Sequence, residues 1–112
     1  MPLDPDLKSR ILQAVEDGFA EQVSFTQKLV QLPSLRGHEH AIQDLLFRSL
    51  QSRGYAMDRF KMDRAAIEAH PGGSKYSDDH SDAPIVVGIH RPRDERGRSL
   101  ILQSHLDVVP EG

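Results

Sequence analysis

Residues 85–110, IVVGIHRPRDERGRSLILQSHLDVVP, decide the fold class that the sequence predicts. Two short apolar runs stand in this stretch, at 85–89 and 100–102, and their aliphatic and β-branched residues are typical of buried strands. The charged residues 92–98 between the runs predict a solvated turn, where Gly97 is available for a positive φ. We therefore expect two strands joined by a turn.

The N-terminal half of the chain predicts two helices. Over residues 1–32, apolar side chains recur at the period of one helical face, and Gly18 is expected to mark a bend. Pro33 ends this pattern, because the residue before a proline avoids helical geometry. A second helix is expected over about 38–53, with Gly54 placed to form a left-handed cap after its end.

The segments between these helices and the two strands complete the fold class. Residues 55–62 alternate loosely between apolar and polar, which favours a half-buried strand. The following connection is rich in Gly, Ser and Asp, so we expect a flexible loop over about 64–83. The prediction is an α/β fold in one domain: two N-terminal helices in a hairpin (1–54), followed by strands of a mixed central sheet (55–112).

Composition excludes several classes of protein. The chain has 112 residues, 14 Lys and Arg against 17 Asp and Glu, and 38% hydrophobic residues, as ordinary globular chains do. No apolar run approaches the length of a membrane span, and an acidic chain without Trp disfavours nucleic-acid binding. The absence of Cys excludes disulfides, thiol catalysis and thiolate zinc sites. Residues 1–4 do not resemble a secretory signal, so we expect a cytoplasmic protein.

His105 and Asp107 are the candidate site residues. They follow the second apolar run, at the carboxyl end of a predicted strand, where open α/β sheets collect their active sites. Residues two apart on an extended chain point to the same side. A metal-ligating His usually gives its other ring N–H to a carboxylate, so the pair fits one ligand and its orienting partner. It equally fits an ordinary strand end in which Asp107 opens a turn, and spacing alone does not choose.

The run SHLDVVP at 104–110 resembles the first metal-site signature of the M20 family of co-catalytic zinc peptidases and deacylases. Within that family it is most similar to the acetylornithine deacetylase and succinyl-diaminopimelate desuccinylase group. Shorter matches follow the family's order along the whole chain: 29–34 (LVQLPS) with Gly37 and Glu39, 50–55 (LQSRGY), 85–88 (IVVG), and 90–92 (HRP) with the long 64–83 connection.

The resemblance implies that the chain is the N-terminal, incomplete part of a zinc-peptidase-like catalytic domain. It makes His105 a ligand of one of two zinc or cobalt ions, and Asp107 the catalytic-site carboxylate that holds its imidazole. The family's bridging carboxylate, its Glu-Glu pair with the general base and its other ligands have no counterpart in this sequence. We therefore expect the isolated chain to bind metal weakly or not at all and to be inactive.

The same resemblance implies the partners of the intact enzyme. It would remove an acyl group from an N-acylated amino acid or cleave a related small peptide substrate, and would bind neither nucleic acid nor membrane. Dimerisation in this family uses a separate domain that is absent from this sequence. The alternative is a non-catalytic α/β interaction module without a metal site, whose last strand would offer unpaired backbone and apolar surface to another chain.

Three further groups of ionisable side chains favour a solvated surface over a site. The acidic residues around His80, at 78–82, do not match the twelve-residue calcium loop. His38 and His40 are two residues apart and so do not share a helical face. The arginines of 91–98 are interrupted by acidic residues, as in a charged turn.

Overall fold

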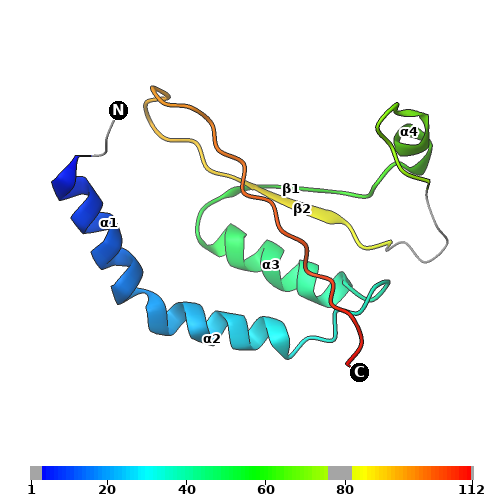
Figure 1. The fold of residues 1–112 in the computed structure, drawn as a ribbon, viewed down its shortest axis with the longest axis horizontal. Coiled ribbons are helices and arrows are strands. Elements are labelled where there is room, and N and C mark those ends of the chain that lie inside the picture. Colours follow the sequence, from blue (N-terminus) through cyan, green and yellow to red (C-terminus); the bar gives the residue numbers. More distant parts are fainter. Residues whose placement is uncertain (1–3, 76–81, 112) are drawn as a thin grey trace. The chain divides into compact units, whose positions relative to one another are not determined.

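The computed structural model describes residues 4–75 and 82–111. It divides into two compact units, Met1–Leu32 and Pro33–Gly112. This boundary falls inside residues 1–54, so their packing as a helical hairpin stays a prediction. The elements follow the order α1 (Pro5–Asp17), α2 (Phe19–Val30), α3 (His40–Ser52), β1 (Ala56–Phe60), α4 (Arg64–Ala69) and β2 (Ile85–Ile89), as labelled in Figure 1.

The first unit consists of α1 and α2, which are separated only by Gly18. Asp4 caps α1, because its carboxylate accepts hydrogen bonds from two backbone N–H groups of the first turn. The N–H of Gly18 donates to the carbonyl of Ala14 at 3.1 Å, and the N–H of Gln22 donates to the carbonyl of Gly18 at 3.0 Å. Helical hydrogen bonding therefore continues through Gly18, and both the predicted helix and its irregularity at this glycine are confirmed.

The apolar side chains of this first unit are not buried. Neither α1 nor α2 has a buried residue, and seven large apolar side chains are between 40% and 80% exposed: Leu7, Ile11, Leu12, Val15, Phe19, Val23 and Val30. The order of this unit thus depends on its cap and its local hydrogen bonds more than on burial. In the described part of the chain, no helix has the length and apolar character needed to cross a membrane.

The second unit contains a helix packed against a strand pair. β1 and β2 pair antiparallel, with Ala56 opposite Ile89, which confirms the strands expected at 55–62 and 85–89. α3 packs on this pair, mainly against β2 (Figure 1). Gly88 permits the close approach, since a Cβ at this position would lie 3.1 Å from Cδ1 of Leu50 on α3. The core therefore lies between α3 and β2, and it includes the buried Ile42.

Charged side chains tie the elements of this unit together. Arg59 on β1 forms an ion pair with Asp44 on α3, and its guanidinium lies 5.4 Å from the ring centroid of Phe47. Just beyond the strand pair, the ammonium of Lys61 donates a hydrogen bond to Asp82 at 3.0 Å. This hydrogen bond, aided by the charge of Lys61, lowers the pKa of Asp82.

The strand expected at 100–102 does not form, so that prediction is wrong. The side chains of Leu100, Ile101 and Leu102 are 79% to 88% exposed, and the segment belongs to no sheet. A lone apolar strand gains stability only where neighbouring strands supply hydrogen bonds and apolar cover. The described residues form a two-stranded antiparallel sheet, not the expected mixed sheet, although one isolated parallel bridge joins Leu35 to Val108.

The flexible loop expected at about 64–83 begins with a short helix, α4, which corrects that prediction for residues 64–69. Asp63 caps this helix by accepting a hydrogen bond from the N–H of Ala66 at 3.1 Å. Arg64 and Glu68 form an ion pair one helical turn apart, at 3.2 Å. The cap and the alanines favour the helix. The expectation of a loop followed from the Gly- and Ser-rich residues after it. Residues 76–81 lie outside the described residues.

Gly54 ends α3 as expected. Its φ of +83° lies in the left-handed region, its N–H donates to the carbonyl of Gln51, and the N–H of Tyr55 donates to the carbonyl of Leu50. These two bonds define a Schellman motif, in which a side chain at the left-handed residue is unfavourable. Gly97 in the 92–98 turn has no positive φ, so the expectation for that glycine is wrong.

The substitution Gly54→Ala is therefore expected to lower the free energy of unfolding by about 1 kcal/mol, since a Cβ is disfavoured at positive φ. Urea denaturation followed by circular dichroism measures this change. Gly97→Ala is the matched control, because a Cβ at that position meets no heavy atom within 4 Å. It should change stability by less than about 0.5 kcal/mol. Equal effects of the two substitutions would contradict the proposed cap.

Candidate functional site

The candidate site lies on the segment that follows the exposed residues 100–102. This segment runs alongside the turn before α3, where the N–H of Val108 donates to the carbonyl of Ser34 at 3.0 Å. The hydroxyl of Ser34 donates to the carbonyl of Leu106 at 2.7 Å. We call these two hydrogen bonds the Ser34 anchor. They hold the backbone on both sides of Asp107.

The turn that carries the Ser34 anchor is itself well defined. The N–H of His38 donates to the carbonyl of Leu35 at 2.8 Å, and Gly37 has a φ of +88°, as the third residue of a type II turn requires. The N–H of Gly37 also donates to the carboxylate of Glu39 at 3.1 Å. Glu39 is buried next to the start of α3. The Ser34 anchor is thus attached to a turn that α3 and its own hydrogen bonds hold in place.

His105 and Asp107 lie in direct contact. The ring nitrogen Nδ1 of His105 is 3.1 Å from Oδ1 of Asp107 and also 3.1 Å from the backbone oxygen of Asp107. The His105 side chain is 84% exposed and the Asp107 side chain is 46% exposed. The imidazole therefore meets two oxygens on one edge, while most of the ring faces solvent.

This geometry determines which nitrogen of a neutral His105 carries the hydrogen. A carbonyl oxygen and an ionised carboxylate oxygen only accept hydrogen bonds, so Nδ1 must be the donor to Asp107. Nε2 then keeps its lone pair, as a metal ligand must. His70 has the opposite arrangement, because its Nδ1 accepts a hydrogen bond from the N–H of Gly72 at 3.0 Å.

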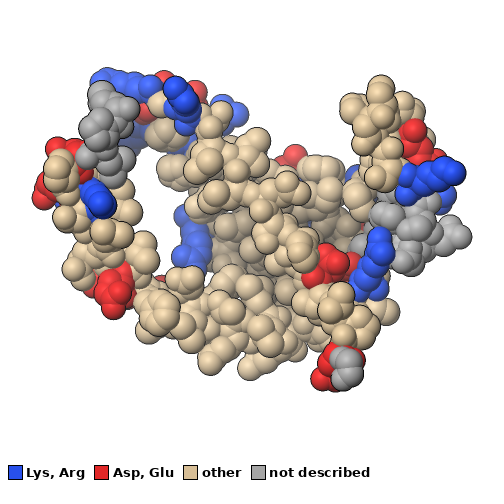
Figure 2. All heavy atoms as spheres, viewed as in Figure 1, with Lys and Arg blue, Asp and Glu red and all other residues tan. Residues whose placement is uncertain are grey.

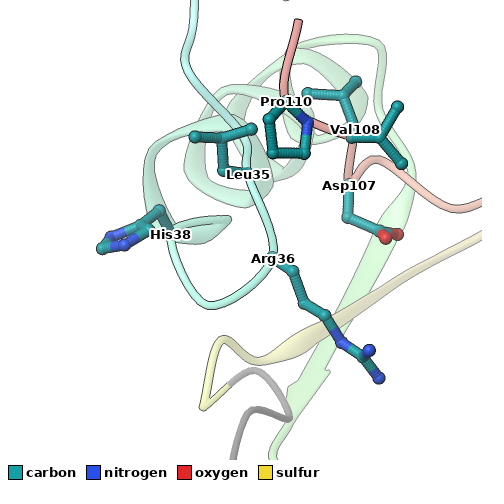
Figure 3. Close-up of a pocket in the computed structure, with 7 residues that line it drawn as sticks. Leu35, Arg36, His38, Asp107, Val108 and Pro110 are labelled. Carbon is teal, nitrogen blue, oxygen red and sulfur yellow. The ribbon is translucent and has the colours of Figure 1, made fainter. Parts of the chain in front are cut away.

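An open hollow lies beside Asp107, between the turn before α3 and the 107–110 segment (Figure 3). Leu35, Arg36 and His38 line one side of it, and apolar residues of the 107–110 segment line the other. His38 points away from Asp107, across the turn, so it does not join the His105 pair (Figure 3). The hollow offers an apolar wall with a carboxylate at its edge.

The other candidates from the sequence do not gather around this pair. In the described ranges, no group of three or more His, Cys, Asp or Glu residues could hold a metal ion. His38 and His40 are exposed, as expected. In the acidic 78–82 cluster, Asp82 pairs with Lys61, and the rest of the cluster lies outside the described residues. The arginine turn is exposed, and Arg96 pairs with the neighbouring Asp94.

Much of the surface along the 99–106 segment carries no Lys, Arg, Asp or Glu side chain (Figure 2). This surface agrees with the high exposure of the apolar residues 100–102. The candidate pair thus stands at the end of an apolar, solvent-facing segment rather than in an enclosed cleft.

Ser34 is the residue of this site to which sequence reasoning gave no role. The sequence placed it between the two predicted helices and in the 29–34 match to the M20 family, but the contact with Leu106 spans 72 positions. The only local hint was a small hydroxyl residue directly after Pro33, which is a weak signal.

Comparison with known proteins gives this chain no family: no family model matches it, and no curated protein or solved structure is significantly similar to it. The resemblance to the M20 peptidases and deacylases therefore depends on the 104–110 run and the shorter matches along the chain. The geometry adds the His105–Asp107 contact, which is a property of this chain itself.

We predict that neutral His105 carries its hydrogen on Nδ1 and neutral His70 carries it on Nε2, because their hydrogen-bond partners are opposite. Long-range ¹H–¹⁵N correlation spectra of the labelled chain distinguish the two forms, and His70 serves as the internal reference. Asp107→Ala, which leaves only the backbone acceptor, should reduce the Nδ1–H form of His105. Two histidines with the same pattern would contradict the described geometry.

Proposed function

We propose that this chain is the N-terminal part of a cytoplasmic, metal-dependent amide hydrolase similar to the M20 deacylases. The observation that carries the proposal is the contact between His105 and Asp107. An exposed imidazole donates through Nδ1 to a carboxylate at 3.1 Å and keeps the lone pair of Nε2 for a ligand. The 104–110 run supports the same reading, because it resembles the family's first metal-site signature.

His105 fits one ligand position of a zinc or cobalt ion. Ligating histidines usually donate their other ring N–H to a carboxylate or a carbonyl, and Asp107 offers both acceptors. Asp107 would therefore orient the imidazole and raise its basicity as a ligand. The bound metal would supply an acidified water and polarise the carbonyl of the substrate. With no Cys in the sequence, all ligands would be His and carboxylate, a set that suits zinc.

This chain would carry only part of that site. A catalytic zinc ion needs about three protein ligands and one open position for water. The intact enzyme would hold two metal ions through a bridging carboxylate and further ligands and would use a general base, and apart from His105 and Asp107 these residues have no counterpart in this sequence. We therefore expect the isolated chain to bind metal weakly or not at all and to lack hydrolase activity.

The substrate class in this proposal comes from the resemblance. It would be an N-acylated amino acid or a small peptide, and the products would be a carboxylate and a free amine. Residues that contact the acyl group would lie outside this sequence, so the choice between deacetylase, desuccinylase and peptidase stays open. A homodimer formed through a domain outside this sequence belongs to the same proposal.

One observation favours the alternative, a non-catalytic interaction module. Residues 100–102 present three exposed aliphatic side chains on a segment outside the sheet, as expected of a surface that another chain covers. In the hydrolase proposal the same residues belong to the central sheet of the complete domain. The two readings differ in what His105 does, because the module needs no ligand there.

A chimera tests the hydrolase proposal. Residues 1–112 would replace the corresponding segment of an active M20 deacylase, and hydrolysis of N-acyl amino acids would be measured with added zinc or cobalt. We expect activity in the chimera, a loss of about 100-fold or more with His105→Ala, and a loss of about 10- to 100-fold with Asp107→Ala. His38→Ala is the matched control, because this exposed imidazole points away from Asp107 (Figure 3).

Two results would count against the proposal. A folded chimera without activity would favour the interaction module, as would a chimera whose activity survives His105→Ala. The 112-residue chain is assayed alongside with the same substrates and metals. Turnover by the isolated chain above that of its His105→Ala variant would contradict an incomplete site.

A further inference from the structure

Ser34 is a buried hydroxyl residue that contacts the candidate site from a distant part of the sequence. Its side chain is only 2% exposed, so solvent does not compete for its hydrogen bonds. The hydroxyl donates to the carbonyl of Leu106 at 2.7 Å, and the carbonyl of Ser34 accepts from the N–H of Val108 at 3.0 Å. The parallel bridge between Leu35 and Val108 lies directly beside these bonds.

The two bonds of the Ser34 anchor hold both peptide groups that flank Asp107. The carbonyl of Leu106 belongs to the peptide group before Asp107, and the N–H of Val108 belongs to the one after it. Peptide groups are planar, so fixing both planes restricts the φ and ψ angles of Asp107. The anchor thus sets the backbone conformation from which the Asp107 carboxylate projects.

The hydrogen bond from the Val108 N–H to Ser34 also fixes the direction of the carbonyl of Asp107. In a trans peptide the N–H and C=O groups point in opposite directions, and the described residues contain no cis peptide bond. Because the Val108 N–H points to Ser34, the Asp107 carbonyl points away from Ser34. That carbonyl oxygen lies 3.1 Å from Nδ1 of His105. Both acceptors of His105 are therefore set by the backbone that Ser34 holds.

We propose that Ser34 is a positioning residue, which acts through Asp107 to keep the His105 imidazole in the Nδ1–H form with Nε2 available for a metal ion. The importance of this form for metal ligation rests on the proposed function. The link from Ser34 to the imidazole is a property of the described geometry and needs no metal.

The experiment measures the tautomer ratio of His105 by long-range ¹H–¹⁵N correlation in the labelled 112-residue chain and its variants. Ser34→Ala removes the hydroxyl donor, and it should lower the ratio of the Nδ1–H form to the Nε2–H form by about threefold or more, as expected for one lost hydrogen bond. Ser34→Thr keeps a hydroxyl and should restore the ratio. The His70 signals should not change, since their partner is Gly72.

Two further variants separate positioning from a general loss of structure. Ser34→Cys is close in size but a weak donor, so it should lower the ratio as Ser34→Ala does while preserving the packing. Ser52→Ala is the matched control, because the Ser52 hydroxyl donates to the carbonyl of Ser49 at 2.9 Å, far along the chain from Asp107. This variant should leave the His105 ratio unchanged.

An unchanged His105 ratio in folded Ser34→Ala or Ser34→Cys would overturn the proposal. If Ser34→Ala unfolds, as judged by the amide signals of β1 and β2, the comparison of Ser34→Cys with Ser34→Thr decides. The measurement uses neither metal nor substrate, so its outcome is independent of the deacylase chimera. If the chimera is inactive but the Ser34 variants of the 112-residue chain still shift the His105 tautomer ratio, the hydrolase proposal is rejected. The positioning role of Ser34 is then retained.

Discussion

The hydrogen bond from the Ser34 hydroxyl to the carbonyl of Leu106 is the contact on which the candidate site depends. Residues 100–105 are exposed, so burial does not fix the path of the chain there. The backbone is fixed again at 106–108, where it forms hydrogen bonds and a parallel bridge with the turn before α3. That turn is held by its own hydrogen bonds and by the buried Glu39. The packed α3 and strand pair thus fix the positions of Asp107 and His105 through this turn.

This arrangement explains how an exposed pair can have a defined geometry. Surface ion pairs contribute little to stability, since solvent screens them and side-chain entropy opposes them. The His105 pair differs because one of its acceptors is a backbone carbonyl whose direction the Ser34 anchor fixes. A preset tautomer with Nε2 directed to solvent is what a ligand position requires before other ligands are present. The geometry thus prepares Nε2 of His105 for the ligand role that we propose.

Local signals in the sequence predicted local structure well. Gly54 and the 85–89 run were placed correctly, because a left-handed cap and a β-branched strand depend mainly on their own residues. α4 was missed because the prediction for 64–83 followed from the Gly- and Ser-rich residues after this helix, and the cap at Asp63 was not recognised. The strand at 100–102 was wrong because strand formation depends on neighbours that local sequence does not reveal. For the same reason, the contact of Ser34 with Leu106, which spans 72 positions, was not predictable, whereas His105 and Asp107 are only two residues apart.

Hydrogen exchange at the backbone amide of Val108 tests the Ser34 anchor most directly. This N–H donates to the carbonyl of a buried residue, whereas the amides of residues 100–102 have no backbone partner within the described part of the chain. Exchange of Val108, corrected for intrinsic rates, is predicted to be about tenfold or more slower than exchange of residues 100–102. Equal corrected rates would mean that the segment is not anchored, and would contradict the role of Ser34 in holding Asp107 and His105.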